Sequence, residues 1–173
     1  MIHALQAAIL LAFPALVIVA AIKDLTSYTI PNWIPLAMVV LFPFAASVCG
    51  LSPMAIGLCL ATGAVGLVAG MAMFAFRWIG GGDAKLFAAA ALWLGLTPSL
   101  TYLFYTALAG GLLAVSLLGL RSARVRAVMP AMPGWFERLA TPGANVPYGV
   151  AIAVGALAAF PLSGVMSALA AHS

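Results

Sequence analysis

The sequence predicts an all-α, polytopic membrane protein of about six transmembrane helices, and three observations support this fold class. Hydrophobic residues make up 66% of the 173 residues, and the mean hydropathy is +1.22. Only 6% of the residues are charged, whereas soluble domains carry roughly 25%. Residues 25–76, 86–120 and 139–173 contain no Asp, Glu, Lys or Arg. So few charges cannot cover a water-exposed surface, so lipid must be the solvent for most of the chain.

Turn-forming residues divide these charge-free stretches into helices. A spanning helix needs roughly 20 apolar residues. We expect helices at 2–22, 33–48, 54–76, 84–96, 100–120 and 146–170, with turns around Gly50–Pro53 and Thr97–Ser99. The helix at 84–96 is short for a full span, so we expect it to be either tilted into a thin region of the bilayer or re-entrant. The length of the chain fits one domain, which we expect to cover residues 1–173.

The basic residues test this arrangement. With six spans, the first, third and fifth connections lie on one side of the membrane. All seven Lys and Arg residues lie in or beside these connections: Lys23, Arg77, Lys85, Arg121, Arg124, Arg126 and Arg138. The positive-inside rule makes this side cytoplasmic and places both termini outside. The same residues are too scattered to form a face that binds nucleic acid.

Several other residues receive structural interpretations. The polar stretch 121–145 is expected to be a cytoplasmic loop with a solvated Glu137, and residues 135–139 could lie along the membrane surface. Small residues in the third helix are expected to allow close helix packing: Gly63, Gly66 and Gly70. Three tryptophans fall near predicted interfaces and are interpreted as anchors: Trp33, Trp78 and Trp93. Cys49 and Cys59 are interpreted as packing residues rather than as a disulfide or metal site.

The acidic residues carry the most information about function. Apart from Glu137, the chain has only Asp24 and Asp83. The predicted helices place both at the same membrane depth on the basic side, although about 60 residues separate them in the sequence. Carboxylates at the membrane boundary are costly and are usually functional. The alternative is that each is an ordinary loop charge, since Lys23 and Lys85 lie close by in the sequence.

The neighbours of the two aspartates favour a functional role. Asp83 ends the run Gly80-Gly81-Gly82-Asp83, and consecutive glycines let a backbone approach a substrate closely. Such a segment could also let an extended peptide pair beside it. Asp24 is followed by a polar loop that a Pro31-Asn32 turn closes. The glycine segment before Asp83 is therefore suited to meeting a peptide, and the turn after Asp24 holds the connection between the first two helices short.

These segments resemble a known family. Gly80-Gly81-Gly82-Asp83 matches the G-x-G-D motif of membrane aspartyl proteases, and the Ala84-Lys85-Leu86 that follows is similar to the type IV prepilin peptidases. Asp24-Leu25 with Ile30-Pro31-Asn32 resembles the first-aspartate segment of that family, and Pro147-Tyr148-Gly149 resembles its third recurring element. The three elements occur in the family's order, and the resemblance spans nearly the whole chain.

The resemblance implies a membrane-embedded aspartic endopeptidase. Members remove the leader peptide from type IV or Flp prepilins, or from pilin-like proteins, at the cytoplasmic face of the bacterial inner membrane. Asp24 and Asp83 would be the catalytic pair, with no metal and no cofactor. The substrate-binding or supporting residues would be Gly80, Gly81, Gly82, Lys85, Pro31, Asn32, Pro147, Tyr148 and Gly149. The partners would be a prepilin and the lipid bilayer.

The chain resembles the short Flp/Tad-type members of the family in particular. Longer members carry a domain with two C-x-x-C pairs that is linked to N-methylation, and this chain has only two separated cysteines. The basic residues common in the family's first-aspartate segment are replaced here at positions 26–29 by Thr, Ser, Tyr and Thr. This departure concerns leader specificity more than the chemistry.

Two rival functions stay open at this point. Intramembrane acids also mark ion pathways, so the chain could be a small transporter or channel. The absence of any charged residue from the predicted midplane disfavours that function. The other rival is a non-catalytic subunit of a pilus or secretion assembly.

Overall fold

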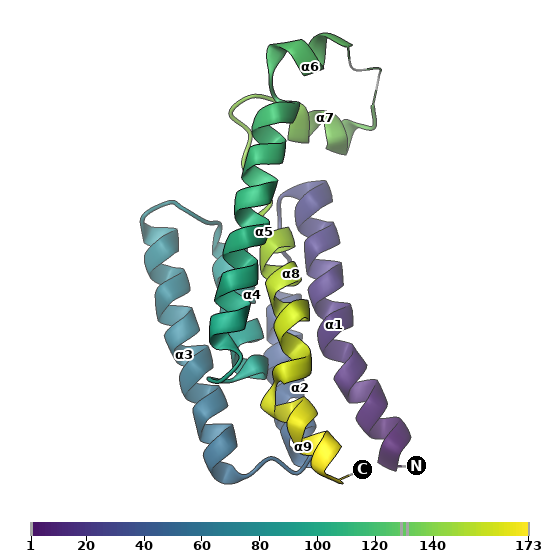
Figure 1. Cartoon of the computed structure of the whole chain (residues 1–173), viewed down its shortest axis with the longest axis vertical. Coiled ribbons are helices and arrows are strands. Elements are labelled where there is room, and N and C mark those ends of the chain that lie inside the picture. The colour runs from purple at the N-terminus through teal and green to yellow at the C-terminus, as the bar shows by residue number, and fades with distance from the viewer. Residues whose placement is uncertain (1, 129, 131, 173) are drawn as a thin grey trace.

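The computed structural model describes residues 2–128, 130 and 132–172, and this part of the chain is helical with no strand (Figure 1). The elements are α1 Ile2–Ser27, α2 Trp33–Val48, α3 Pro53–Ala75, α4 Gly81–Leu94, α5 Ser99–Leu120, α6 Ala123–Val128, α7 Gly134–Ala140, α8 Tyr148–Ala159, the 3₁₀ helix η1 Phe160–Leu162, and α9 Gly164–His172.

Within the residues that the structure describes, four segments are long and apolar enough to cross a bilayer. They are Gln6–Ser27 in α1, Pro53–Ala75 in α3, Ser99–Leu120 in α5, and Tyr148–Ala170, which runs from α8 through η1 into α9. The helices α2 and α4 are shorter. At about 1.5 Å per residue, the 14 residues of α4 extend only about 21 Å, less than the roughly 30 Å hydrocarbon core. The all-α, polytopic membrane fold is confirmed.

The short helix α4 is the centre of the bundle. It packs against α2, α3 and α8, and its residues from Leu86 to Leu94 are all buried. Trp93 is fully buried among Phe13 and Phe42, and its indole N–H donates a 2.7 Å hydrogen bond to the Met38 carbonyl. The prediction that Trp93 is an interfacial anchor is therefore wrong, because its ring fills the core that holds α4.

Small residues bring α3 against α4, as the sequence predicted. An added Cβ would lie 2.9 Å from Leu92 Cβ at Gly63, and 3.0 Å from Ala91 Cβ at Gly66. At Gly70 an added Cβ would lie 3.0 Å from the Ala84 carbonyl oxygen. Side chains at these positions would force the two helices apart. The glycines of α3 therefore fix the helix whose first turn carries Asp83.

Three helices differ from the sequence-based boundaries by more than one residue. The helix expected at 84–96 spans Gly81–Leu94, so Asp83 lies in its first turn. The first helix was expected to end at residue 22 but continues to Ser27, so Asp24 lies within α1 rather than after it. The Ser27 hydroxyl donates to the Lys23 carbonyl at 2.7 Å, which compensates for the polar sequence of this last turn. The last predicted helix, 146–170, breaks into α8, η1 and α9 at Pro161, because proline has no N–H for the helical ladder.

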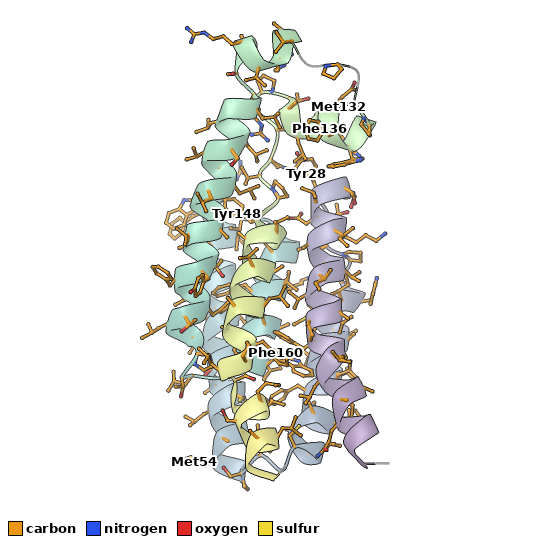
Figure 2. All side chains as sticks on the ribbon, turned by 45° about the vertical axis from the view of Figure 1, so that its right-hand side comes forward. Tyr28, Met54, Met132, Phe136, Tyr148 and Phe160 are labelled. Atoms are coloured by element: carbon orange, nitrogen blue, oxygen red, sulfur yellow. The ribbon has the colours of Figure 1, made fainter. Side chains whose placement is uncertain are left out.

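The loop 121–145 contains two short helices at the end of the bundle where α1 and α5 finish (Figure 1). Arg138 donates to the Thr26 carbonyl at 2.9 Å, and Arg121 donates to the Leu139 carbonyl at 2.8 Å. The first bond places a cation at the carboxyl end of α1, where the helix dipole favours positive charge. Figure 2 shows Phe136 of α7 lying beyond Tyr28 at this end. The loop is thus fastened to the helix that carries Asp24.

Candidate active site

Three glycines determine how Asp83 is presented. Gly80 caps α4 in an extended conformation, and Gly81 and Gly82 form the first two positions of the helix. Asp83 is therefore the first residue of α4 with a side chain. Its Oδ2 turns back to accept a 3.0 Å hydrogen bond from the Gly80 N–H. Its Oδ1 is buried without a hydrogen-bond partner among the described residues, and so is left for a proton or a substrate group.

Asp24 is held by the start of α8. Its side chain is 4% exposed, and its Oδ2 accepts a 2.7 Å hydrogen bond from the Gly149 N–H. A Cβ at position 149 would lie 2.8 Å from that oxygen and 2.8 Å from Ile30 Cδ1. The backbone of α8 can approach the carboxylate this closely because glycine leaves no side chain between them.

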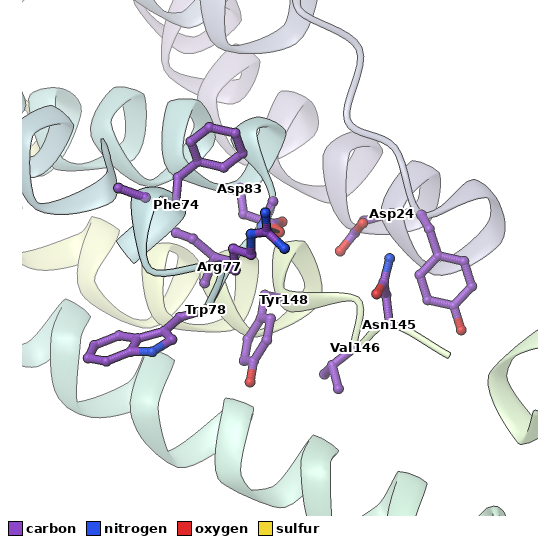
Figure 3. A pocket seen from close by; sticks show the side chains of 12 residues that line it. Asp24, Phe74, Arg77, Trp78, Asp83, Asn145, Val146 and Tyr148 are labelled. Carbon is purple, nitrogen blue, oxygen red and sulfur yellow. Dashed lines mark hydrogen bonds between the residues drawn. The ribbon is translucent and has the colours of Figure 1, made fainter. Parts of the chain in front are cut away.

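The two carboxylates lie close enough to interact electrostatically. Among the described residues, the Gly149 N–H donates a hydrogen bond to Asp24, while Asp83 takes its hydrogen bond from Gly80. Figure 3 shows both side chains directed into one cavity from different helices. That cavity has a volume of about 480 Å³. A second cavity, of about 250 Å³, reaches the pair from the side of the 28–30 loop and Gly80–Gly82.

The environment of Asp83 favours its neutral form. Burial raises the pKa of Asp83 from 3.8 to about 6, because a buried site disfavours a charge. The Gly80 and Gly149 N–H groups oppose this shift by stabilising the carboxylate. With its pKa near 6, Asp83 can exchange a proton close to neutral pH, as a general acid or base requires.

Some of the other predicted site residues line the two cavities that reach the carboxylates, and others lie outside them. Tyr148 lines the larger cavity, Gly80 lines both, and Gly81 and Gly82 line the smaller one. Pro147 is buried at the cap of α8, next to Gly149. Asn32, which follows Pro31, is the cap residue of α2, and its Oδ1 accepts a 2.9 Å hydrogen bond from Lys85 Nζ instead of capping the helix. Asn32 and Lys85 line neither of the two cavities that reach the carboxylates.

Eight residues that line the larger cavity were not predicted as site residues from the sequence, and three of them carry polar groups of interest. Tyr28 and Arg77 line it in left-handed backbone conformations, with φ of 53° and 60°. Such values are uncommon for residues other than glycine and cluster at functional sites. Asn145 lies opposite, and its carbonyl accepts a 2.8 Å hydrogen bond from Arg121. The sequence indicates only a topological role for Arg77. The one feature that could have identified it as a site residue is its position just before the glycine run.

Comparison with protein families identifies the relationship. The model of the type IV leader peptidase family matches residues 11–115, more than half of the chain. The chain belongs to this family. No curated protein and no solved structure gave a match. The part matched by the leader peptidase family contains Asp24 and Asp83, whereas residues 147–149 lie beyond it.

Membership of the type IV leader peptidase family gives the general activity. The protein is a leader-peptidase-like protease, and the class of substrate is prepilin-type proteins in general. Its apolar helices make it a membrane protein. A protease activity is consistent with the site described above, in which two buried acids from separate helices face a common cavity.

Proposed function

We propose that the protein is an aspartic endopeptidase in which Asp24 and Asp83 together activate water and cleave the leader from a prepilin. The observation that carries this proposal is that two buried carboxylates, brought together from helices far apart in the sequence, line one cavity. Two acids that merely balanced loop charges would pair with nearby cations. Neither aspartate forms an ion pair with Lys or Arg in the part of the chain that the structure describes.

The chemistry follows from two adjacent carboxylates. Two such groups cannot both ionise cheaply, so the pair shares one proton. The ionised carboxylate takes a proton from water, and the oxygen of that water attacks the carbonyl carbon of the scissile peptide bond. The protonated carboxyl donates its proton to the carbonyl oxygen, and a proton then reaches the leaving amine as the C–N bond breaks. The pair titrates as a unit, so the proposal assigns the two roles jointly.

The position of the cavities suggests how a peptide could reach the pair. The larger cavity lies between the end of α3 and the start of α8, and the smaller lies beneath the 28–30 loop. An extended chain that passes from one cavity to the other would bring a peptide bond to the carboxylates. Gly80–Gly82 leave room beside this path, and Arg77 and Tyr148 would contact the residues next to the cut.

The proposal also states on which side of the membrane the active site lies. All seven basic residues lie at or beyond one end of the bundle, where the carboxylates also lie. By the positive-inside rule this end is cytoplasmic, so cleavage would take place at the cytoplasmic face of a bacterial inner membrane. Because the chain resembles the short Flp/Tad-type members of the family, we propose a Flp-type prepilin as the substrate. The whole chain would be one peptidase domain.

A cleavage assay tests this function. The chain would be co-expressed with a Flp-type prepilin, and loss of the leader would be followed as a size shift on a gel. The Asp24→Asn and Asp83→Asn variants would be run beside it, with their membrane levels checked. We expect cleavage by the wild type and loss of cleavage in both variants. Full activity in either variant would contradict the paired mechanism, and a proton flux that depends on Asp24 without cleavage would instead indicate transport.

A further inference from the structure

A third cavity, with a greater volume than either cavity that reaches the carboxylates, lies on a different side of α4. It has a volume of about 560 Å³, within the range of roughly 300–1,000 Å³ typical of ligand sites. Three helices line it with residues spaced one and two turns apart, from Asn32 to Val39 on α2, from Leu60 to Leu67 on α3, and from Lys85 to Leu92 on α4. We call this cavity the α2–α4 groove. Along each helix it extends over eight residues, about 10 Å from the first to the last.

The α2–α4 groove is an unfilled space in the helix packing. Both α2 and α3 pack on α4 rather than on each other. The floor consists largely of small residues, such as Ala88 and Ala89, which are too short to fill the space between the flanking helices. The rim is apolar and outward-facing, since Leu36 is 61% exposed and Leu60 is 56% exposed. The groove therefore opens toward the lipid.

One end of the groove carries a positive charge. Lys85 Nζ is held at the rim by the 2.9 Å hydrogen bond to Asn32 Oδ1. An ammonium group has three donors, so two remain available. Lys85 forms no ion pair with any residue that the structure describes. The site thus combines an apolar trough with a single cation whose charge is not neutralised.

We propose that the α2–α4 groove binds an anionic phospholipid, with an acyl chain in the trough and the headgroup phosphate on Lys85. An acyl chain is apolar and narrow, and it can follow a groove between helices. The phosphate supplies the negative charge and the acceptors that Lys85 lacks. The groove's charged end lies at the basic end of the bundle, where anionic headgroups gather at a cytoplasmic surface.

The substrate's apolar helix fits this groove less well than a lipid does. Neither Asp24 nor Asp83 lines the groove, and α4 separates it from both cavities that reach them. A helix with its side chains is about 10–12 Å across, and a substrate lying here would have to turn around α4 to reach the carboxylates. A bound lipid has no such requirement. It would instead hold α2 and α3 against α4.

Lipid binding to the purified full-length chain tests this proposal. The protein in a neutral detergent would be titrated with phosphatidylglycerol or phosphatidylcholine, and adducts would be counted by native mass spectrometry. One lysine near a charged headgroup contributes about fivefold in affinity, so we expect phosphatidylglycerol to bind about fivefold more tightly. Glycerol phosphate, which has no acyl chain, is expected not to compete.

Two variants examine the two parts of the site. Lys85→Met should abolish the preference for phosphatidylglycerol, while Ala64→Phe should fill the trough and weaken the binding of both lipids. Ala64 lines the groove, whereas Ala69 is exposed on the same helix and outside the lining, so Ala69→Phe is the matched control. Equal binding of both lipids, or unchanged binding in Ala64→Phe, would overturn the proposal. A photoreactive group at Val39 that crosslinks a prepilin instead of a lipid would also overturn it.

Discussion

The approach of α8 to Asp24 depends on the absence of a side chain at position 149, so Gly149→Ala is the most informative small change in the site. The new Cβ would lie 2.8 Å from Asp24 Oδ2 and 3.0 Å from Asp24 Cβ, closer than real Cβ contacts allow or at their limit. It would also lie 2.8 Å from Ile30 Cδ1, a terminal atom that can turn away, so the constraint comes from Asp24, whose Cβ is fixed to α1 and whose Oδ2 is bonded to the Gly149 N–H. Either α8 or the Asp24 carboxylate must move.

The size of the movement sets the expected loss. Ordinary van der Waals contact begins at 3.4 Å, so a Cβ at 2.8 Å must separate from the carboxylate by about 0.6 Å more. Catalytic groups have to be held within about 0.5 Å of their productive positions, and a misplacement of about 1 Å can cost about 100-fold. We therefore expect kcat for prepilin cleavage to fall by about 10- to 100-fold.

The assay would use purified enzyme in proteoliposomes with a prepilin substrate. Gly111→Ala on α5 is the control, because no atom lies within 4 Å of its added Cβ. It should keep wild-type kcat and gain slightly in stability, since alanine favours a helix more than glycine does. If Gly149→Ala cleaved at the wild-type rate, the close contact between α8 and Asp24 would not be needed for catalysis, and the reasoning would be refuted.

Three further changes test other parts of the structure. The pKa of Asp83 rises from 3.8 to about 6 on folding, chiefly through burial, so the folded state binds more protons than the unfolded state between these values. The wild-type Tm should therefore fall as pH rises from 4 to 6, and Asp83→Asn should reduce this fall in thermal scans. Gly70→Ala would place a Cβ 3.0 Å from the Ala84 carbonyl oxygen and should lower stability by about 1–3 kcal/mol and reduce cleavage; Gly57→Ala is its control. Arg77→Gly should raise stability by about 1 kcal/mol by relieving its φ of 60°, yet lower kcat/KM.

Each of these has a result that would contradict it. If the Tm of Asp83→Asn depended on pH as the wild-type Tm does, the buried Asp83 carboxyl would not be the cause of that dependence. Equal effects of the Gly70 and Gly57 substitutions would mean that the α3–α4 contact does not position the first turn of α4. An Arg77→Gly variant with wild-type kcat/KM would show that the guanidinium group in the cavity does not contact the substrate productively.

Much of the fold was predictable because lipid imposes simple rules on sequence. Long charge-free stretches, broken by the turns at Gly50–Pro53 and Thr97–Ser99, predicted α2 with its observed boundaries and α3 and α5 to within a residue. These rules failed at the end of α1, where polar residues predicted that the helix had already ended. The helix continues there because the Ser27 side chain forms a hydrogen bond with the preceding turn. The rules also failed at Trp93, whose position along the sequence does not reveal that α4 is surrounded by protein rather than lipid.

The candidate site was also predictable only in part. The G-x-G-D pattern and the first-aspartate segment pointed to Asp83 and Asp24, which the fold brings to one cavity. Lys85 is only two residues from Asp83, and the family resemblance implied a substrate-binding or supporting role for it. Two residues along a helix correspond to a rotation of about 200°, so Lys85 faces away from the pair and toward the α2–α4 groove. Sequence distance alone could not distinguish these faces.

The arrangement explains why glycines, rather than cations, accompany both acids. Each carboxylate takes its hydrogen bond from the backbone N–H of a glycine, at 3.0 Å from Gly80 and 2.7 Å from Gly149. An added Cβ at these glycines would lie 3.0 Å and 2.8 Å from the bonded oxygens. A neutral N–H stabilises a carboxylate without the strong fall in pKa that an adjacent cation causes. Asp83 can therefore stay buried with a pKa near 6, and a chain that kept both acids but lost these glycines would keep its topology while losing the poised pair.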